Sequence, residues 1–175
     1  EAQCRQLLST AFAQNHPVAV RYPRGAGIGK TPEEGLQPAP FGKARVLREG
    51  RDIAILGFGP VTYAALQAAN RLDATLVDMR WVKPLDTEML AHLARSHACW
   101  VTVEEGVIAG GAGSAVNEVV HQLHNPSDRD DRPIRILNLG LPDRFVEHGD
   151  PAKLMSLCGL DADGIEQSIR RFFGR

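Results

Sequence analysis

The arginine at position 24 is the first residue of this sequence that could do chemistry. It stands in the run RYPRG (residues 21–25), directly after a short apolar run and directly before residues with little side-chain bulk. A guanidinium group can hold a phosphate monoester or a carboxylate through two parallel hydrogen bonds. Arg24 is therefore a candidate anion-binding residue, and an ion pair at a domain edge is the alternative interpretation.

The glycines after Arg24 look like a nucleotide-binding loop, but their spacing is wrong. The run GAGIGKT (residues 25–31) is one residue short of the pattern that cradles nucleotide phosphates, which must also open a helix. Three prolines follow before residue 41, and proline is poorly tolerated inside a helix. We therefore predict that residues 25–41 form a linker.

A second glycine cluster, residues 106–113, follows the acidic pair Glu104 and Glu105. Its spacing, GxxxGGxG, differs from the GxGxxG of dinucleotide-binding turns, and the two glutamates would repel a pyrophosphate. The alternative is a tight turn whose glycines let the backbone approach a neighbour closely. Either glutamate is a candidate catalytic carboxylate, since parallel sheets bind ligands at the carboxyl ends of their strands. Capping the glycine turn or pairing with an arginine are the alternatives for both.

The remaining nucleophiles and metal ligands form no pattern typical of a site. Ser114 lies in GAGSA rather than GxSxG, and the histidines are scattered, most of them expected at the surface. The three cysteines Cys4, Cys99 and Cys158 are far apart and include no CxxC, so neither a zinc site nor a disulfide framework is indicated. This cysteine usage fits a reducing cytoplasm.

Composition excludes several classes of protein. The formal net charge of −1 argues against a general nucleic-acid binder, which usually shows a basic face. The most apolar window is interrupted by glycine and proline and is too short for a membrane span, and the first residues do not resemble a signal peptide. The chain begins without methionine and within a helical pattern, so we expect it to be a piece of a longer protein.

The elements that must position these residues alternate between strand and helix from residue 52 onward, the pattern of βαβ units with a parallel sheet. An antiparallel edge strand is expected near residues 42–48, and Asp86 is placed to cap a helix. The predicted strands are 52–57, 74–79, 98–103 and 134–139, and the predicted helices are 61–72, 87–96, 112–123, 151–158 and 163–173.

Residues 1–24 do not belong to that series. They predict one helix, 4–14, and one strand, 18–22, which cannot make a core alone. We therefore expect three parts, which are the last αβ unit of a preceding domain (1–24), a linker (25–41) and a complete small domain (42–175).

Several blocks of the sequence resemble one known family. They are AVRYPRG, ATLVDMRWVKPLD, VTVEEGVIAGGAGSAVNEVV, LNLGLPDRFVEHG and LCGLDADGIEQSI. In this order and spacing they resemble the carboxyl-terminal part of the 1-deoxy-D-xylulose-5-phosphate synthases, thiamine-diphosphate enzymes of the transketolase-like superfamily. The resemblance covers nearly the whole chain. Asp143 and His148 match a late loop of the family for which no catalytic role is assigned.

The resemblance implies a fold and an activity. The fold would be the transketolase C-terminal domain, an α/β domain whose mostly parallel sheet has helices on both faces, preceded by the end of a pyrimidine-binding domain. The family condenses pyruvate with glyceraldehyde 3-phosphate, releases CO2 and supplies isoprenoid, thiamine and pyridoxal precursors. Arg24 matches the arginine that helps to hold the phosphate of glyceraldehyde 3-phosphate. A cytoplasmic homodimer is implied as well.

The resemblance also implies that thiamine diphosphate and Mg²⁺ are bound by regions absent from this chain, because the GDG-type motif that holds them does not occur here. The chain alone is then expected to be inactive. Two alternatives stay open, the end of a 2-oxo acid dehydrogenase E1 β subunit and a non-catalytic α/β interaction domain. The run MRWVKPLD and the arginine at position 24 argue against the dehydrogenase subunit.

Overall fold

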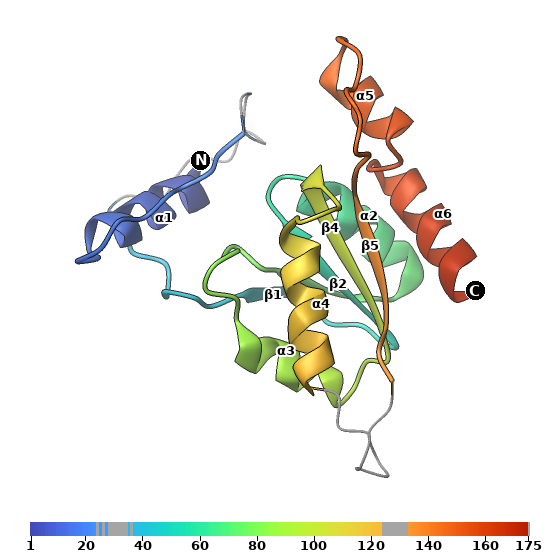
Figure 1. Cartoon of the computed structure of the whole chain (residues 1–175), viewed down its shortest axis with the longest axis horizontal. Helices are drawn as coiled ribbons and strands as arrows, with labels where there is room; N and C mark the ends of the chain where they lie inside the picture. The colour runs from blue at the N-terminus through green and yellow to red at the C-terminus, as the bar shows by residue number, and fades with distance from the viewer. Residues whose placement is uncertain (24, 26, 28–34, 36, 124–132, 175) are drawn as a thin grey trace.

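A five-stranded sheet forms the centre of the computed structural model (Figure 1). The structure describes residues 1–23, 25, 27, 35, 37–123 and 133–174. The strands follow the order β1-β3-β2-β4-β5. Their bounds are β1 Arg45–Arg48, β2 Ile53–Phe58, β3 Thr75–Asp78, β4 Cys99–Val107 and β5 Arg135–Leu141.

Four of these strands are parallel, and β1 runs antiparallel to β3 at one edge. The central strand β2 is buried along its whole length, as expected for a run of apolar residues with a strand on each side and helices on both faces. The mostly parallel α/β sheet and its antiparallel edge strand are confirmed.

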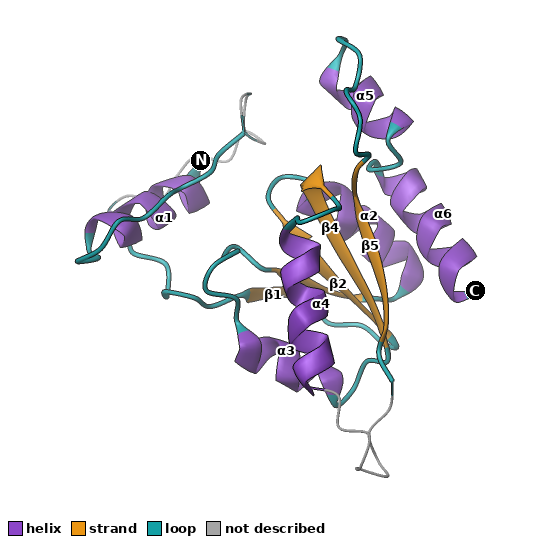
Figure 2. Cartoon of the chain, in the orientation of Figure 1, coloured by secondary structure: helices purple, strands orange, loops and turns teal. Residues whose placement is uncertain are grey.

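The helices cover both faces of the sheet (Figure 2). Helices α2 and α6 pack on one face around Ile55 and Val103, and helices α3 and α4 pack on the other face around Leu56 and Trp100. The helix bounds are α1 Ala2–Phe12, α2 Thr62–Leu72, α3 Thr87–Ala94, α4 Ala112–Leu123, α5 Pro151–Leu157 and α6 Ala162–Phe173. None of the helices in the described ranges is long and apolar enough to cross a membrane.

Local sequence explains where several helices begin. The Asp86 carboxylate accepts a hydrogen bond from the Met89 N–H at 3.0 Å, so the predicted cap of α3 is confirmed. Asp150 and Asp161 cap α5 and α6 in the same way. Helix α2 presents small buried alanines to the sheet, so it can pack close to β2 and β3.

The N-terminal segment differs from its prediction. Helix α1 forms, although it begins and ends two residues earlier than expected, but residues 18–22 belong to no strand. The strand prediction is wrong because a β-strand needs a hydrogen-bonded neighbour, and the described part of the chain provides none beside this segment. Helix α1 is linked to the residues after it through Thr10, whose hydroxyl donates to the Ala39 carbonyl at 3.0 Å.

Candidate functional site

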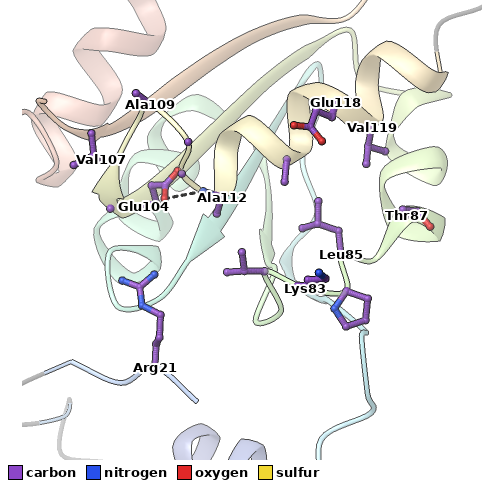
Figure 3. Close-up of a pocket in the computed structure, with 16 residues that line it drawn as sticks. Arg21, Lys83, Leu85, Thr87, Glu104, Val107, Ala109, Ala112, Glu118 and Val119 are labelled. Atoms are coloured by element: carbon purple, nitrogen blue, oxygen red, sulfur yellow. Dashed lines mark hydrogen bonds between the residues drawn. The ribbon is translucent and has the colours of Figure 1, made fainter. Parts of the chain in front are cut away.

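A cleft of about 850 Å³ lies at the carboxyl ends of β3 and β4 (Figure 3). Its walls are the loop between β3 and α3, the glycine turn between β4 and α4, and the first turns of α4. The chain passes from β2 to β3 on one side and then to β4 on the other, so the strand order reverses beside this cleft. Such a reversal is where open α/β sheets bind ligands.

Glu104 occupies the inner end of the cleft. This buried carboxylate accepts hydrogen bonds from the backbone N–H groups of Ala112 and Gly113, both at 2.9 Å. These N–H groups begin α4, where a negative charge is favoured by the helix dipole. Glu104 therefore caps α4, which is one of the two non-catalytic roles open to it.

The glycine turn is shaped around this carboxylate. A Cβ atom added at Gly111 would lie 2.5 Å from a Glu104 oxygen, and one added at Gly106 would lie 2.7 Å from the other oxygen. Gly110 adopts a left-handed φ of 70°. The cluster is thus a tight turn whose helix terminus already holds an anion from the same chain, so it offers no cradle to a dinucleotide phosphate.

Glu105 points to the opposite face of β4, since neighbouring strand residues alternate. The pKa of Glu105 is raised, because partial burial disfavours its charged form. The hydrogen bond from the Val61 N–H and the positive charge of Arg21 offset only part of this rise. Val61 precedes α2, so the two consecutive glutamates hydrogen-bond to the starts of two helices that lie on opposite faces of the sheet. Glu105 also brings a negative charge close to Arg21.

Arg21 enters the cleft from the N-terminal segment, and Figure 3 shows its guanidinium group directed toward the sheet edge near Glu104. Lys83, from the loop after β3, lines the same cleft, and so does Glu118 on α4. Arg24 lies outside the described residues, as does most of the run GAGIGKT. The placement of the predicted phosphate-binding residue therefore stays a prediction.

The hydroxyl of Ser114 forms a hydrogen bond within the glycine turn. It donates to the carbonyl of Ile108 at 3.2 Å and so helps to close the loop before α4.

One histidine departs from the expected surface position, since His97 is buried and contacts the Thr75 hydroxyl at 2.9 Å and the Ser96 hydroxyl at 2.8 Å. It lies at the amino end of the parallel strands, away from the cleft.

Sequence reasoning did not identify Asp78, a buried carboxylate at the carboxyl end of β3. Gln3 of α1 donates to it at 2.6 Å, and the Arg45 guanidinium lies 3.6 Å away. Burial raises the pKa of Asp78, and the hydrogen bond from Gln3 and the charge of Arg45 lower it. An acidic residue at the end of an apolar strand is the one signal that could have pointed to this position.

Two features of the described residues bear on whether a diphosphate cofactor and its metal could bind here. Within the described ranges, no group of three or more histidine, cysteine, aspartate or glutamate side chains could hold a metal ion. The helix terminus that faces the cleft already binds the Glu104 carboxylate.

Comparisons with known proteins agree with this architecture. The chain is 58% identical over 176 residues to 1-deoxy-D-xylulose-5-phosphate synthase of Polaromonas sp. (strain JS666), covering 99% of this chain and 26% of that protein. It is also 58% identical over 174 residues to the protein of the same name from Acidovorax ebreus, covering 99% of this chain and 27% of that protein. The chain thus spans about a quarter of the length of these relatives.

A solved structure supports the same relationship. A split-gene transketolase, described as an inactive β4 tetramer, superposes with a TM-score of 0.68 at 34% identity, covering 78% of this chain and 44% of that one. The family model for the transketolase C-terminal domain matches residues 42–165. These residues contain the whole sheet, the glutamate-capped glycine turn and every residue that lines the cleft except Arg21. The chain belongs to the transketolase C-terminal domain family.

Proposed function

We propose that this chain is the carboxyl-terminal part of a 1-deoxy-D-xylulose-5-phosphate synthase. The full-length enzyme would join pyruvate to glyceraldehyde 3-phosphate, with release of CO2, to give 1-deoxy-D-xylulose 5-phosphate. The observation that carries this proposal is 58% identity along 99% of the chain to proteins of that name. Thiamine diphosphate and Mg²⁺ would be held by regions outside these residues and would supply the carbon–carbon chemistry.

We further propose a division of labour along the chain. Residues 1–24 would be the end of the preceding pyrimidine-binding domain, residues 25–41 a linker and residues 42–175 the complete C-terminal domain. The C-terminal domain would provide packing surfaces, while the N-terminal segment would carry the substrate contact. From the family relationship alone, we propose a homodimer that acts in the cytoplasm.

The substrate contact is assigned to Arg24, which would bind the phosphate of glyceraldehyde 3-phosphate. The match of RYPRG to the family supports this proposal. The guanidinium fork suits the two-pronged recognition of a phosphate dianion.

The activity is tested with the full-length enzyme. Incubation with pyruvate and glyceraldehyde 3-phosphate should yield CO2 and the five-carbon sugar phosphate in equal amounts, and omission of thiamine diphosphate should stop both. Pyruvate decarboxylation that proceeds without incorporation of glyceraldehyde 3-phosphate would sink the assignment.

In that enzyme, Arg24→Ala should raise the KM for glyceraldehyde 3-phosphate and leave the KM for pyruvate unchanged, because only the former substrate carries a phosphate. A lost charge-assisted contact is worth about 1.5–3 kcal/mol. The expected rise is therefore on the order of ten- to a hundredfold, since about 1.4 kcal/mol corresponds to a factor of ten. Arg24→Lys should recover only part of the affinity.

The matched control is Arg171→Ala, which removes an exposed arginine from the end of α6. This control should change neither KM. If Arg24→Ala lowers the melting temperature but keeps both KM values, Arg24 is a structural ion-pair residue and the phosphate assignment is wrong.

A further inference from the structure

The connection between β5 and α5 contains a short segment, residues 143–148, that the proposed function leaves without a role. Its sequence is DRFVEH, and it is called the DRFVEH strip below. All of its residues are exposed, and Phe145 and Val146 form an apolar pair at its centre. In Figure 1 the connection rises from the end of β5 toward α5 at the top of the view. An exposed apolar pair rimmed by charged residues is the arrangement of a protein contact surface.

Both ends of the DRFVEH strip are held by the fold. Before the strip, the Leu141 carbonyl accepts a hydrogen bond from the Ile108 N–H at 3.4 Å. After the strip, the Asp150 carboxylate caps α5. The chain bends at 143–144 and at 148–149 and runs without a bend between them. The strip is thus presented at a defined place on the surface.

The polar groups of the DRFVEH strip have no partners within the described part of the chain. Its titratable side chains form no hydrogen bond or ion pair with another described residue. They are those of Asp143, Arg144, Glu147 and His148. The backbone groups of residues 145–148 likewise form no hydrogen bond with the backbone of another described residue. Charges, backbone groups and apolar side chains are therefore all available to another molecule.

The order of the side chains makes the DRFVEH strip complementary to itself. When the strips of two copies run antiparallel, each side chain lies opposite one of matching character. The three pairs are Phe145 with Val146, Arg144 with Glu147, and Asp143 with His148. Residues directly opposite each other in an antiparallel pair are close neighbours, and opposite charges attract there. A histidine ring N–H can also donate to a carboxylate.

We propose that the DRFVEH strip is a contact surface between two copies of this protein, in which the two strips pair antiparallel across a two-fold axis. A two-fold interface uses the same patch on both subunits, so the patch must be complementary to itself. The charge order of the strip meets this requirement. The pairing rests on the homodimer of the proposed function for its biological role, but its test needs no activity.

The size of the strip sets the expected strength of the contact. A segment of this length on each copy buries less than the about 1,200 Å² at which stable protein interfaces begin. The 175-residue chain should therefore dimerise weakly through this surface, with a Kd on the order of 100 μM. Sedimentation velocity over a range of concentrations up to about 1 mM measures such an equilibrium.

Charge reversal tests the pairing of the two strips. Arg144→Glu and Glu147→Arg should each weaken dimerisation by roughly tenfold, because both ion pairs across the two-fold axis then become repulsive. An equimolar mixture of the two variants should dimerise about as well as the wild type. In the mixture, one variant has only negative charges at these two positions and the other has only positive charges, so both pairs attract again.

The matched control is Arg171→Glu, which makes the same change of charge at an exposed position of α6 and should leave the Kd unchanged. Phe145→Ser should weaken dimerisation by roughly tenfold, because the apolar centre of the contact is lost. All of these side chains are exposed, so the variants should keep the melting temperature of the wild type.

Weaker dimers in both single variants, with recovery in their mixture, support the antiparallel pairing. A wild-type chain that stays monomeric at about 1 mM, or a mixture that stays monomeric, overturns it. The pairing is also overturned if Arg144→Glu dimerises like the wild type, or if Arg171→Glu weakens the dimer equally. None of these results affects the synthase assignment, which product formation by the full-length enzyme tests separately.

Discussion

Two adjacent glutamates at the end of β4 each hydrogen-bond to the start of a helix, and the two helices lie on different faces of the sheet. Glu104 binds the first N–H groups of α4, and Glu105 binds the N–H of Val61 before α2. The alternation of side chains along a strand makes this arrangement possible. A pair of acidic residues that suggests catalysis is thereby accounted for by helix capping.

The cap made by Glu104 has a measurable cost of removal. Glu104→Ala should lower the free energy of unfolding of this chain by about 2–4 kcal/mol, because two buried N–H groups lose a charged acceptor. Glu104→Gln should cost less, since one oxygen remains. Urea denaturation gives the values, and Glu118→Ala, an exposed carboxylate on the same helix, should change stability by about 0.5 kcal/mol or less. Equal losses in the two alanine variants would contradict the capping role.

Most elements could be predicted because their signals are local. Helix α4 has the predicted bounds, and the cap of α3 follows from Asp86. The contact between Gln3 and Asp78 could not be predicted, because it joins residues that only the folded sheet brings together. The strand expected at 18–22 failed for a related reason, since pairing depends on a neighbouring strand that local sequence does not reveal.

At the scale of elements, the junction between α3 and β4 contains a buried histidine. His97 hydrogen-bonds to Thr75 at the start of β3 and to the adjacent Ser96. Burial lowers the pKa of His97. The unfolded chain then takes up a proton at a higher pH than the folded protein does, so protonation favours unfolding.

The free energy of unfolding should therefore fall as the pH drops below about 6.5, the ordinary pKa of histidine. His97→Gln should flatten this dependence between about pH 7.5 and about pH 5.5, as measured by urea denaturation at each pH. His121→Gln, which changes an exposed histidine on α4, should retain the wild-type profile. A wild-type profile in His97→Gln would show that the pH dependence arises elsewhere.

At the scale of the whole molecule, the chain contains a five-stranded α/β sheet, and a glycine turn capped by Glu104 lines the cleft at the carboxyl ends of its strands. Titration calorimetry with thiamine diphosphate and Mg²⁺ should show no saturable binding to the 175-residue chain. The reason is that the described residues provide no metal-ligand cluster and no free helix terminus in the glycine turn. The full-length enzyme serves as the positive control, and saturable binding to the chain alone would refute the assignment of the cofactor site to other regions.

The edge strand β1 has a consequence for how the protein behaves in concentrated solution. Its exposed Val46 and Leu47 lie between Arg45 and Arg48, and the strand pairing shifts register at this point. A short, irregular and charged edge is a poor template for the backbone of another molecule. The two arginines thus disfavour pairing of β1 with a strand of another molecule, which would otherwise extend the sheet into a β-rich assembly.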